Sequence, residues 1–216
     1  HGEILSSQFN QGIIYRVAGT PGSTAAPFAT VERGITGLAQ LPNGDIAVAS
    51  SREDRILRID ATSGFTKGIL FDNLIDNPRG LTLHRGGTLW VSALSNDQVV
   101  AIDAYTGEEL HRLTIPRAFA IAADADRIYV TGQAEGSVYM IDALTGDYLG
   151  VLAQNLGPNL EEMTINRAGD LLIGDSADGI LRVDAATGAI LARAPTFTPG
   201  PVAIDHDGFL ISKNID

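Results

Sequence analysis

The sequence predicts an all-β protein, a β-propeller of four-stranded blades, and three observations support this prediction. An apolar residue followed by Asp-Ala-x-Thr/Ser-Gly recurs along the chain, and its aspartates are 43, 39 and 42 residues apart (Asp60, Asp103, Asp142 and Asp184). A period near 40 residues is typical of propeller blades. Each period holds four short apolar or alternating runs, which is the pattern of strands and not of helices. The 24 glycines and 9 prolines are spread over the whole length, as many regular turns require.

We expect one domain over residues 1–216, with full blades at 34–78, 79–116, 117–158 and 159–199. In the second full blade the expected strands, named a to d in chain order, are Leu81–Leu83, Thr88–Ala93, Val99–Ile102 and Glu109–Thr114. A tight turn such as Asn43-Gly44 separates strands a and b. The repeated Asp-Ala-x-Thr-Gly phrase forms the turn between strands c and d, where the aspartate can accept hydrogen bonds from backbone amides.

The two chain ends form partial blades. Residues 1–33 supply strands b to d and residues 200–216 supply strands a and b. We expect a five-bladed ring closed by these two ends, with six blades, including partial ones, as the alternative. Closure leaves one strand over, at Phe209–Ser212, and an unpaired strand edge is a template for another chain. The predicted assembly edge, from which a homo-oligomer or filament would form, comprises Glu3, Ile4, Leu5, Ser6, Phe209, Leu210, Ile211 and Ser212. The alternatives are truncation of a longer protein and replacement of one terminal strand by another.

Composition excludes several partners. A net charge of -11 disfavours nucleic acid and anionic membrane surfaces. No uncharged apolar run is long enough for a membrane span, and the absence of cysteine excludes disulfides and thiolate metal sites. The chain starts at His1 without a methionine, so we expect a signal peptide to have been removed and the protein to be secreted, extracellular or periplasmic.

Two segments resemble known repeats. Arg127-Ile-Tyr-Val-Thr-Gly, followed by 137–146, resembles a YVTN repeat, and Gly80-Leu-Thr-Leu with 87–91 resembles a blade of the NHL or lactonase type. The resemblance to this propeller superfamily covers nearly the whole chain. It implies the fold but no single function, because such propellers serve as lactonases, lyases, scaffolds and sensors.

A site is expected where strand a begins and strand b ends, because both lie at one face of the ring near the central channel. Aligned blades place five residues at the start of strand a: Gly37, Gly80, Phe119, Glu162 and Pro201. The predicted ligand-binding residues at this channel mouth are Arg79, Arg117, Glu161, Glu162, Asp175 and Lys213. The carboxylates of Glu162 and Asp175 could hold a hard cation such as calcium, or act as an acid/base pair. The alternative is a solvated ring of ion pairs.

The resemblance to lactonase-type propellers implies a divalent metal held by Glu, Asn and Asp around the channel. Glu162 and Asp175 are the matching positions here, with Asn159 or Asn214 as a third ligand. Propellers similar to streptogramin lyases use a channel histidine instead. The candidates His84, His206 and His111 fall on turns at the opposite face or on an outer strand.

The function we expect is that of a non-catalytic secreted propeller, a binding or structural module for which the sequence identifies no cofactor beyond the calcium considered above. The alternative is a metal-dependent, lactonase-like hydrolase with Glu162 and Asp175 as its catalytic and metal-binding residues. A Gly-x-Ser-x-Gly elbow, a phosphate-binding loop and zinc-ligand spacing are all absent from the sequence.

Overall fold

The computed structural model describes residues 3–18, 23–177, 179–195, 202–204 and 210–212, which form strands β1 to β21. Within these ranges there is no helix long and apolar enough to cross a membrane. The first sheet is β1 (Glu3–Gln8), β2 (Ile13–Ala18) and β3 (Ala26–Thr30). The next two sheets are β4 (Ile35–Gln40), β5 (Ile46–Ser50), β6 (Arg55–Ile59), β7 (Thr66–Phe71), and β8 (Pro78–His84), β9 (Thr88–Ala93), β10 (Gln98–Asp103), β11 (Glu109–Thr114). Two more are β12 (Ala118–Ala123), β13 (Arg127–Gly132), β14 (Ser137–Asp142), β15 (Tyr148–Ala153), and β16 (Leu160–Ile165), β17 (Leu171–Asp175), β18 (Gly179–Val183), β19 (Ile190–Ala194). The last sheet is β20 (Val202–Ile204) with β21 (Leu210–Ser212).

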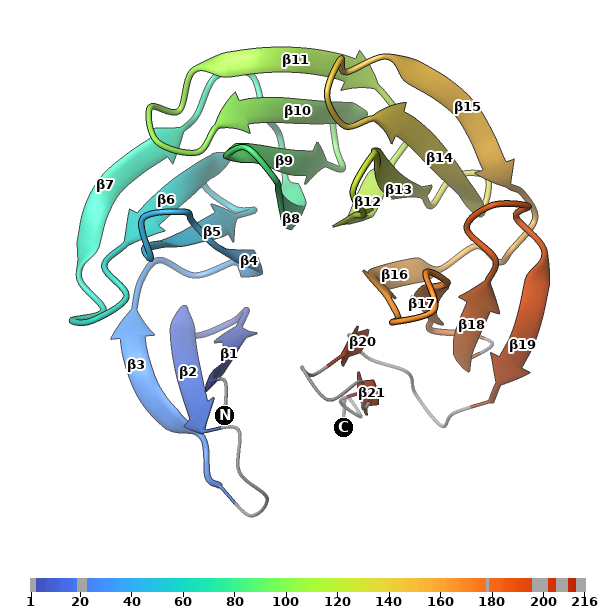
Figure 1. Cartoon of the computed structure of the whole chain (residues 1–216). Helices are drawn as coiled ribbons and strands as arrows, with labels where there is room; N and C mark the ends of the chain where they lie inside the picture. Colours follow the sequence, from blue (N-terminus) through green and yellow to red (C-terminus); the bar gives the residue numbers. More distant parts are fainter. Residues whose placement is uncertain (1–2, 19–22, 178, 196–201, 205–209, 213–216) are drawn as a thin grey trace.

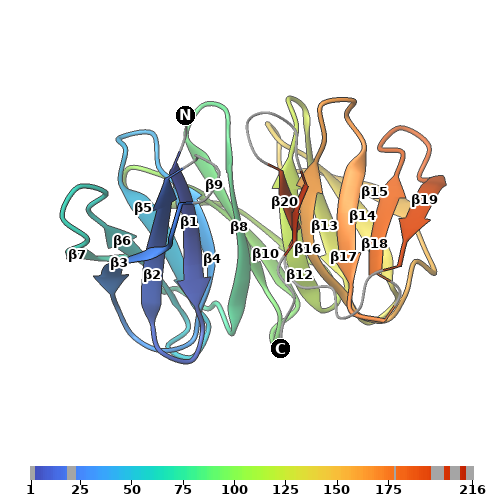
Figure 2. The ribbon, with the colours of Figure 1, turned by 90° about the horizontal axis from the view of Figure 1, so that it is seen from below.

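The sheets stand around a common axis as blades of a β-propeller (Figure 1), which confirms the predicted fold class. Each four-stranded blade is an antiparallel meander whose first strand is innermost and whose last strand is outermost. Seen from the side, the strands of each blade run between the two faces of the ring (Figure 2). Turns between strands b and c therefore gather at one face, together with the connections from strand d to the next strand a.

Five blades surround the axis, four with four strands and the first with three, and the two-stranded sheet β20–β21 follows them. β20 lies against β16 and is hydrogen-bonded to β21. Among the described strands no ladder joins β20 to β1, so the two partial sheets are paired separately at the seam of the five-bladed ring. Within the predicted assembly edge, Glu3–Ser6 lie in β1 and Leu210–Ser212 form β21, while Phe209 lies outside the described residues. Pairing of these edges with another chain stays a prediction.

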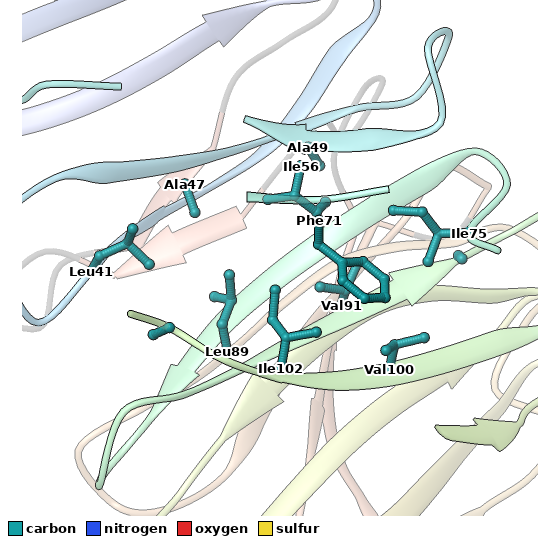
Figure 3. Packing of buried hydrophobic residues seen from close by; sticks show 12 residues of the cluster. Leu41, Ala47, Ala49, Ile56, Phe71, Ile75, Leu89, Val91, Val100 and Ile102 are labelled. Carbon is teal, nitrogen blue, oxygen red and sulfur yellow. The ribbon is translucent and has the colours of Figure 1, made fainter. Parts of the chain in front are cut away.

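The hydrophobic core lies between the blades. Alternate residues of β9 serve two interfaces, since Leu89 and Val91 pack toward β4–β7 while Trp90 packs toward β12–β15. Figure 3 shows the first of these interfaces, where Phe71 and Ile75 of one blade meet Val91 of the next. A strand buried on both faces needs apolar residues at nearly every position, which explains the continuous apolar runs of strands b and c.

The repeated phrase closes one blade and joins it to the blade before. Asp103 Oδ1 accepts hydrogen bonds from the amides of Tyr105 and Thr106, each at 2.8 Å. These bonds hold the pKa of the Asp103 carboxyl below its ordinary value. Gly107 has a φ of +77°, and a β-carbon there would lie 2.0 Å from the carbonyl oxygen of Leu70 in the preceding blade. The glycine is thus required by the turn and by the close approach of the neighbouring outer strand.

Candidate functional site

The same β-bulge occurs near the start of each inner strand from β4 to β16. In β8, Pro78 pairs with Ala93 and the next pair is Leu81 with Val91, so two residues of the inner strand oppose one residue of β9. The corresponding shifts occur in β4, β12 and β16. The bulged pairs are Thr36-Gly37, Arg79-Gly80, Phe119-Ala120 and Glu161-Glu162. A bulge redirects its side chains, and bulges are over-represented beside active sites.

Hydrogen bonds between neighbouring blades hold these bulges in place. Thr36 Oγ1 donates to the carbonyl oxygen of Pro78 at 2.9 Å, and Ser92 Oγ donates to that of Phe119. The last bulge is reached by Gln133, whose Nε2 donates to the carbonyl oxygen of Leu160 at 2.9 Å. The backbone that presents the bulged residues is therefore fixed from one blade to the next.

Bulge side chains from three inner strands form what we name the channel-mouth site: Arg79, Phe119, Glu161 and Glu162. Arg79 Cζ lies 5.1 Å from the centre of the Phe119 ring and 6.0 Å from that of Phe9, in the turn between β1 and β2. Arg52 Cζ also lies over the Phe9 ring, 5.1 Å from its centre. Guanidinium groups over aromatic faces are stabilised by cation–π attraction.

The Arg79 side chain is partly buried, and its Nε atom is fully buried without a hydrogen-bond acceptor among the described residues. Burial lowers the pKa of Arg79, while the carboxylates of Glu162 and Glu161 raise it. The guanidinium stays charged despite its burial, because the pKa of arginine is far above neutral pH. Arg79 therefore interacts electrostatically with both glutamates, and its Nε donor has no acceptor among the residues that the structure describes.

The carboxyl groups of Glu161 and Glu162 both have raised pKa values. For Glu162, burial is the main cause and the Glu161 carboxylate adds to it, while Arg79 acts in the opposite direction. For Glu161, burial again comes first, followed by Asp175, whereas the Ser176 hydroxyl and Arg79 lower the pKa. Neighbouring carboxyls with raised pKa values are suited to acid–base chemistry.

Asp175 is completely buried beside this pair. Its Oδ1 accepts a hydrogen bond from the amide of Ala177 at 2.7 Å, and its Oδ2 lies so close to Gly157 that a β-carbon there would come within 2.0 Å. Gly157 also lines a pocket of about 600 Å³ formed by the β13–β14 turn and the β15–β16 connection. Asp175 thus fixes a turn and acts on Glu161 through its charge, and a solvent pocket adjoins it.

The other two predicted ligand-binding residues are Arg117 and Lys213. Arg117 is exposed, with a φ of 47°, and its backbone amide donates to Asp97 Oδ1 at 2.7 Å. Lys213 lies outside the described residues. The sequence alignment placed Phe119 level with Gly37 and Gly80, but the bulge register places it level with Arg79 and Glu161. Phe9 and Arg52 were not predicted as site residues. The signal that the sequence offered was an aromatic residue, Phe9, in a turn between strands b and c.

The lactonase resemblance implies a divalent-metal site made of Glu, Asn and Asp side chains. Within the described residues, no group of three or more His, Asp or Glu side chains could hold a metal ion. Asn159 is exposed, and Asn214 and Lys213 lie in the part of the chain left undescribed. Calcium at Glu162 and Asp175 stays a prediction.

No histidine that the structure describes lies at the channel mouth. His84 lies at the end of β8 that is far from the channel mouth, and its Nε2 atom is 3.0 Å from the carbonyl oxygen of Ala125. His111, on the outer strand β11, stacks on Trp90 with ring centres 6.1 Å apart. His206 lies outside the described residues.

Fold and site together define a repeat propeller with a polar, partly aromatic site on its inner strands. The family model described as outer membrane protein assembly factor BamB matches residues 76–205, and the chain belongs to this family of β-propellers. No curated protein sequence matches the chain.

Solved structures with the same fold include enzymes. A gluconolactonase from Xanthomonas campestris has a TM-score of 0.85 at 13% identity, and the match covers 98% of this chain and 79% of that one. A nidogen/laminin complex has a TM-score of 0.80 at 16% identity, covering 98% and 85%. A catalytically inactive virginiamycin B lyase from Staphylococcus aureus with quinupristin has a TM-score of 0.75 at 18% identity, covering 94% and 71%.

These matches confirm the resemblance to NHL, YVTN and lactonase-like propellers. The expectation of a non-catalytic module was wrong. It rested on the absence of a catalytic motif, whereas the similar structures include a lactonase and a lyase, and an enzymatic, lactonase-like function fits these findings better.

Proposed function

We propose that this protein is a lactonase-like hydrolase that opens a small lactone or ester at the channel-mouth site. The observation that carries the proposal is the pair of raised-pKa carboxyls, Glu161 and Glu162, on a bulged inner strand facing Arg79. The likeness of the fold to a gluconolactonase supports the reaction class. A histidine-based lyase is less well supported, since the described histidines lie away from this site.

In this proposal Glu162 is the proton-transfer group. Its carboxylate takes a proton from water while the water oxygen bonds to the carbonyl carbon of the substrate. The carbon–oxygen bond of the ester then breaks, and the departing alkoxide takes the proton back from Glu162. A lactone thereby gives a hydroxy acid, and an open-chain ester gives an acid and an alcohol. A base with a pKa raised toward the working pH performs both transfers more effectively than an ordinary glutamate. Glu161 is a positioning residue, because its charge adds to the burial that raises the Glu162 pKa.

The test is hydrolysis of a panel of γ- and δ-lactones and simple methyl esters, followed by acid release in a pH-stat. Glu162→Gln should lower kcat by about 100-fold or more, as the loss of a general base does. Glu108→Gln is the matched control, because Glu108 is exposed on the turn between β10 and β11, and it should keep wild-type rates. Full activity in Glu162→Gln, or no hydrolysis across the panel, would overturn the proposal. Parallel assays with calcium or with EDTA separate metal-dependent hydrolysis from metal-independent hydrolysis.

A further inference from the structure

We propose that the ligand of the channel-mouth site carries a carboxylate group and that Arg79 binds it. This inference deepens the hydrolase proposal, on which it rests for the reaction, by giving the substrate a chemical class. It rests on the contacts that the Arg79 guanidinium makes with its neighbours.

The guanidinium of Arg79 lies over two aromatic rings. The rings of Phe119 and Phe9 lie 5.1 Å and 6.0 Å from Cζ. These contacts attract the charge of the guanidinium, but the rings supply no oxygen acceptor for its N–H donors.

No carboxylate in the described part of the chain forms an ion pair with Arg79. The ion pairs found in the described part of the chain, such as Arg55 with Glu32 and Lys67 with Asp45, do not include Arg79. The buried Nε of Arg79 has no acceptor there either. The terminal Nη donors of Arg79 likewise form no hydrogen bond with a described residue, and they are not buried. A ligand that brings a charged acceptor to these terminal donors gains affinity.

A carboxylate fits these donors better than a more highly charged anion does. The planar fork of a guanidinium matches the two oxygens of a carboxylate. Glu161 and Glu162 act on Arg79 through their charges, and they would repel a dianion more strongly than a monoanion. A ligand with a carboxylate at one end and a neutral ester at the other would place its carbonyl carbon toward Glu162.

The binding test uses a pair of probes that differ only in charge, phenylacetate and its neutral amide, measured by calorimetry on the intact chain. Wild type should bind phenylacetate about 10- to 100-fold more tightly than the amide, the range expected for hydrogen bonds to a charged group. Arg79→Gln should remove this preference. Arg79→Lys should keep part of it, because the charge remains and the fork is lost. Arg85→Gln is the matched control, since Arg85 is exposed just beyond the opposite end of β8.

The kinetic test compares methyl hydrogen succinate with dimethyl succinate. Wild type should have a higher kcat/KM for the charged ester, and Arg79→Gln should bring the two values together by raising KM. If both esters are cleaved equally and phenylacetate binds no better than its amide, the carboxylate proposal is overturned while the hydrolase stands. If phenylacetate binds through Arg79 and no ester is cleaved, the anion site stands while the hydrolase falls. The wild-type comparison of acid with amide decides the case even if the Arg79 variants fail to fold.

Discussion

Arg79 and Phe119 join the inner strands of two neighbouring blades, with the Arg79 Cζ atom 5.1 Å from the centre of the Phe119 ring. Both residues occupy the first position of the same bulge, one blade apart. The contact therefore links equivalent positions of two neighbouring blades, and it orients the Arg79 guanidinium that faces Glu161 and Glu162.

Phe119→Leu should loosen this orientation. The apolar contact is largely kept, but the cation–π attraction, about 0.5–2 kcal/mol, is lost. We expect the affinity for phenylacetate to fall by about 2- to 30-fold on that basis, with little change in the far-UV CD spectrum. Phe65→Leu, on a turn where Phe65 is 72% exposed, is the control and should bind as wild type does. Unchanged affinity in Phe119→Leu would show that the ring does not position Arg79.

Glu162→Gln should flatten the pH dependence of stability. The folded-state pKa of Glu162 is raised, so between the unfolded pKa and the folded pKa the native state binds more protons than the unfolded state. Stability is then greatest below the unfolded pKa and falls as pH rises through the folded pKa. Glutamine carries no charge to desolvate, so the variant should have a higher Tm than wild type at pH 8 and a similar Tm at pH 4. Melting curves across this range, with Glu108→Gln as control, make the comparison, and a lower Tm for Glu162→Gln at pH 8 would contradict it.

Activity should follow the same titration in the opposite sense. The carboxylate form of Glu162 accepts the proton from water, so kcat/KM should fall as pH drops through its raised pKa. Glu161→Gln removes the neighbouring charge that raises this pKa, and it should shift the acidic limb of the profile to lower pH. A profile that does not move would exclude Glu161 as a positioning residue.

Gly107→Ala should destabilise the protein more than Gly86→Ala does. Both glycines have positive φ values, +77° and +88°, and each alanine has a backbone cost of about 1–2 kcal/mol. At Gly107 the new methyl group would also meet the Leu70 carbonyl oxygen at 2.0 Å, whereas at Gly86 nothing lies within 4 Å. Urea unfolding gives the free energy of unfolding of both variants, and the difference between them is the cost of the contact between blades. Equal losses of stability would show that only the turn requires glycine.

The blade pattern could be predicted because it is local. Alternation and turn residues mark strands such as β9 and β10, and the repeat spacing gives the blade length. The bulge could not be read in the same way, since it changes the register without changing the apolar pattern, and Phe119 was aligned one position away from its true equivalents. The contact of Phe9 with Arg79 depends on how a turn of the first sheet reaches the inner strand of another blade. The pairing of β20 with β21 at the seam is likewise a tertiary choice between two available partners.

The four bulges divide their residues between packing and chemistry. A β-carbon at Gly37 would lie 2.5 Å from the Arg79 carbonyl oxygen, and one at Gly80 would lie 2.9 Å from that of Phe119, so these second positions are held by the neighbouring blade. Arg79 and Glu161, at the first position, belong to no core cluster, and an exchange of side chains there can alter what the ring recognises while leaving those close approaches intact. Chains with this architecture can therefore diverge in substrate through a few inner positions, with little demand on the rest of the sequence.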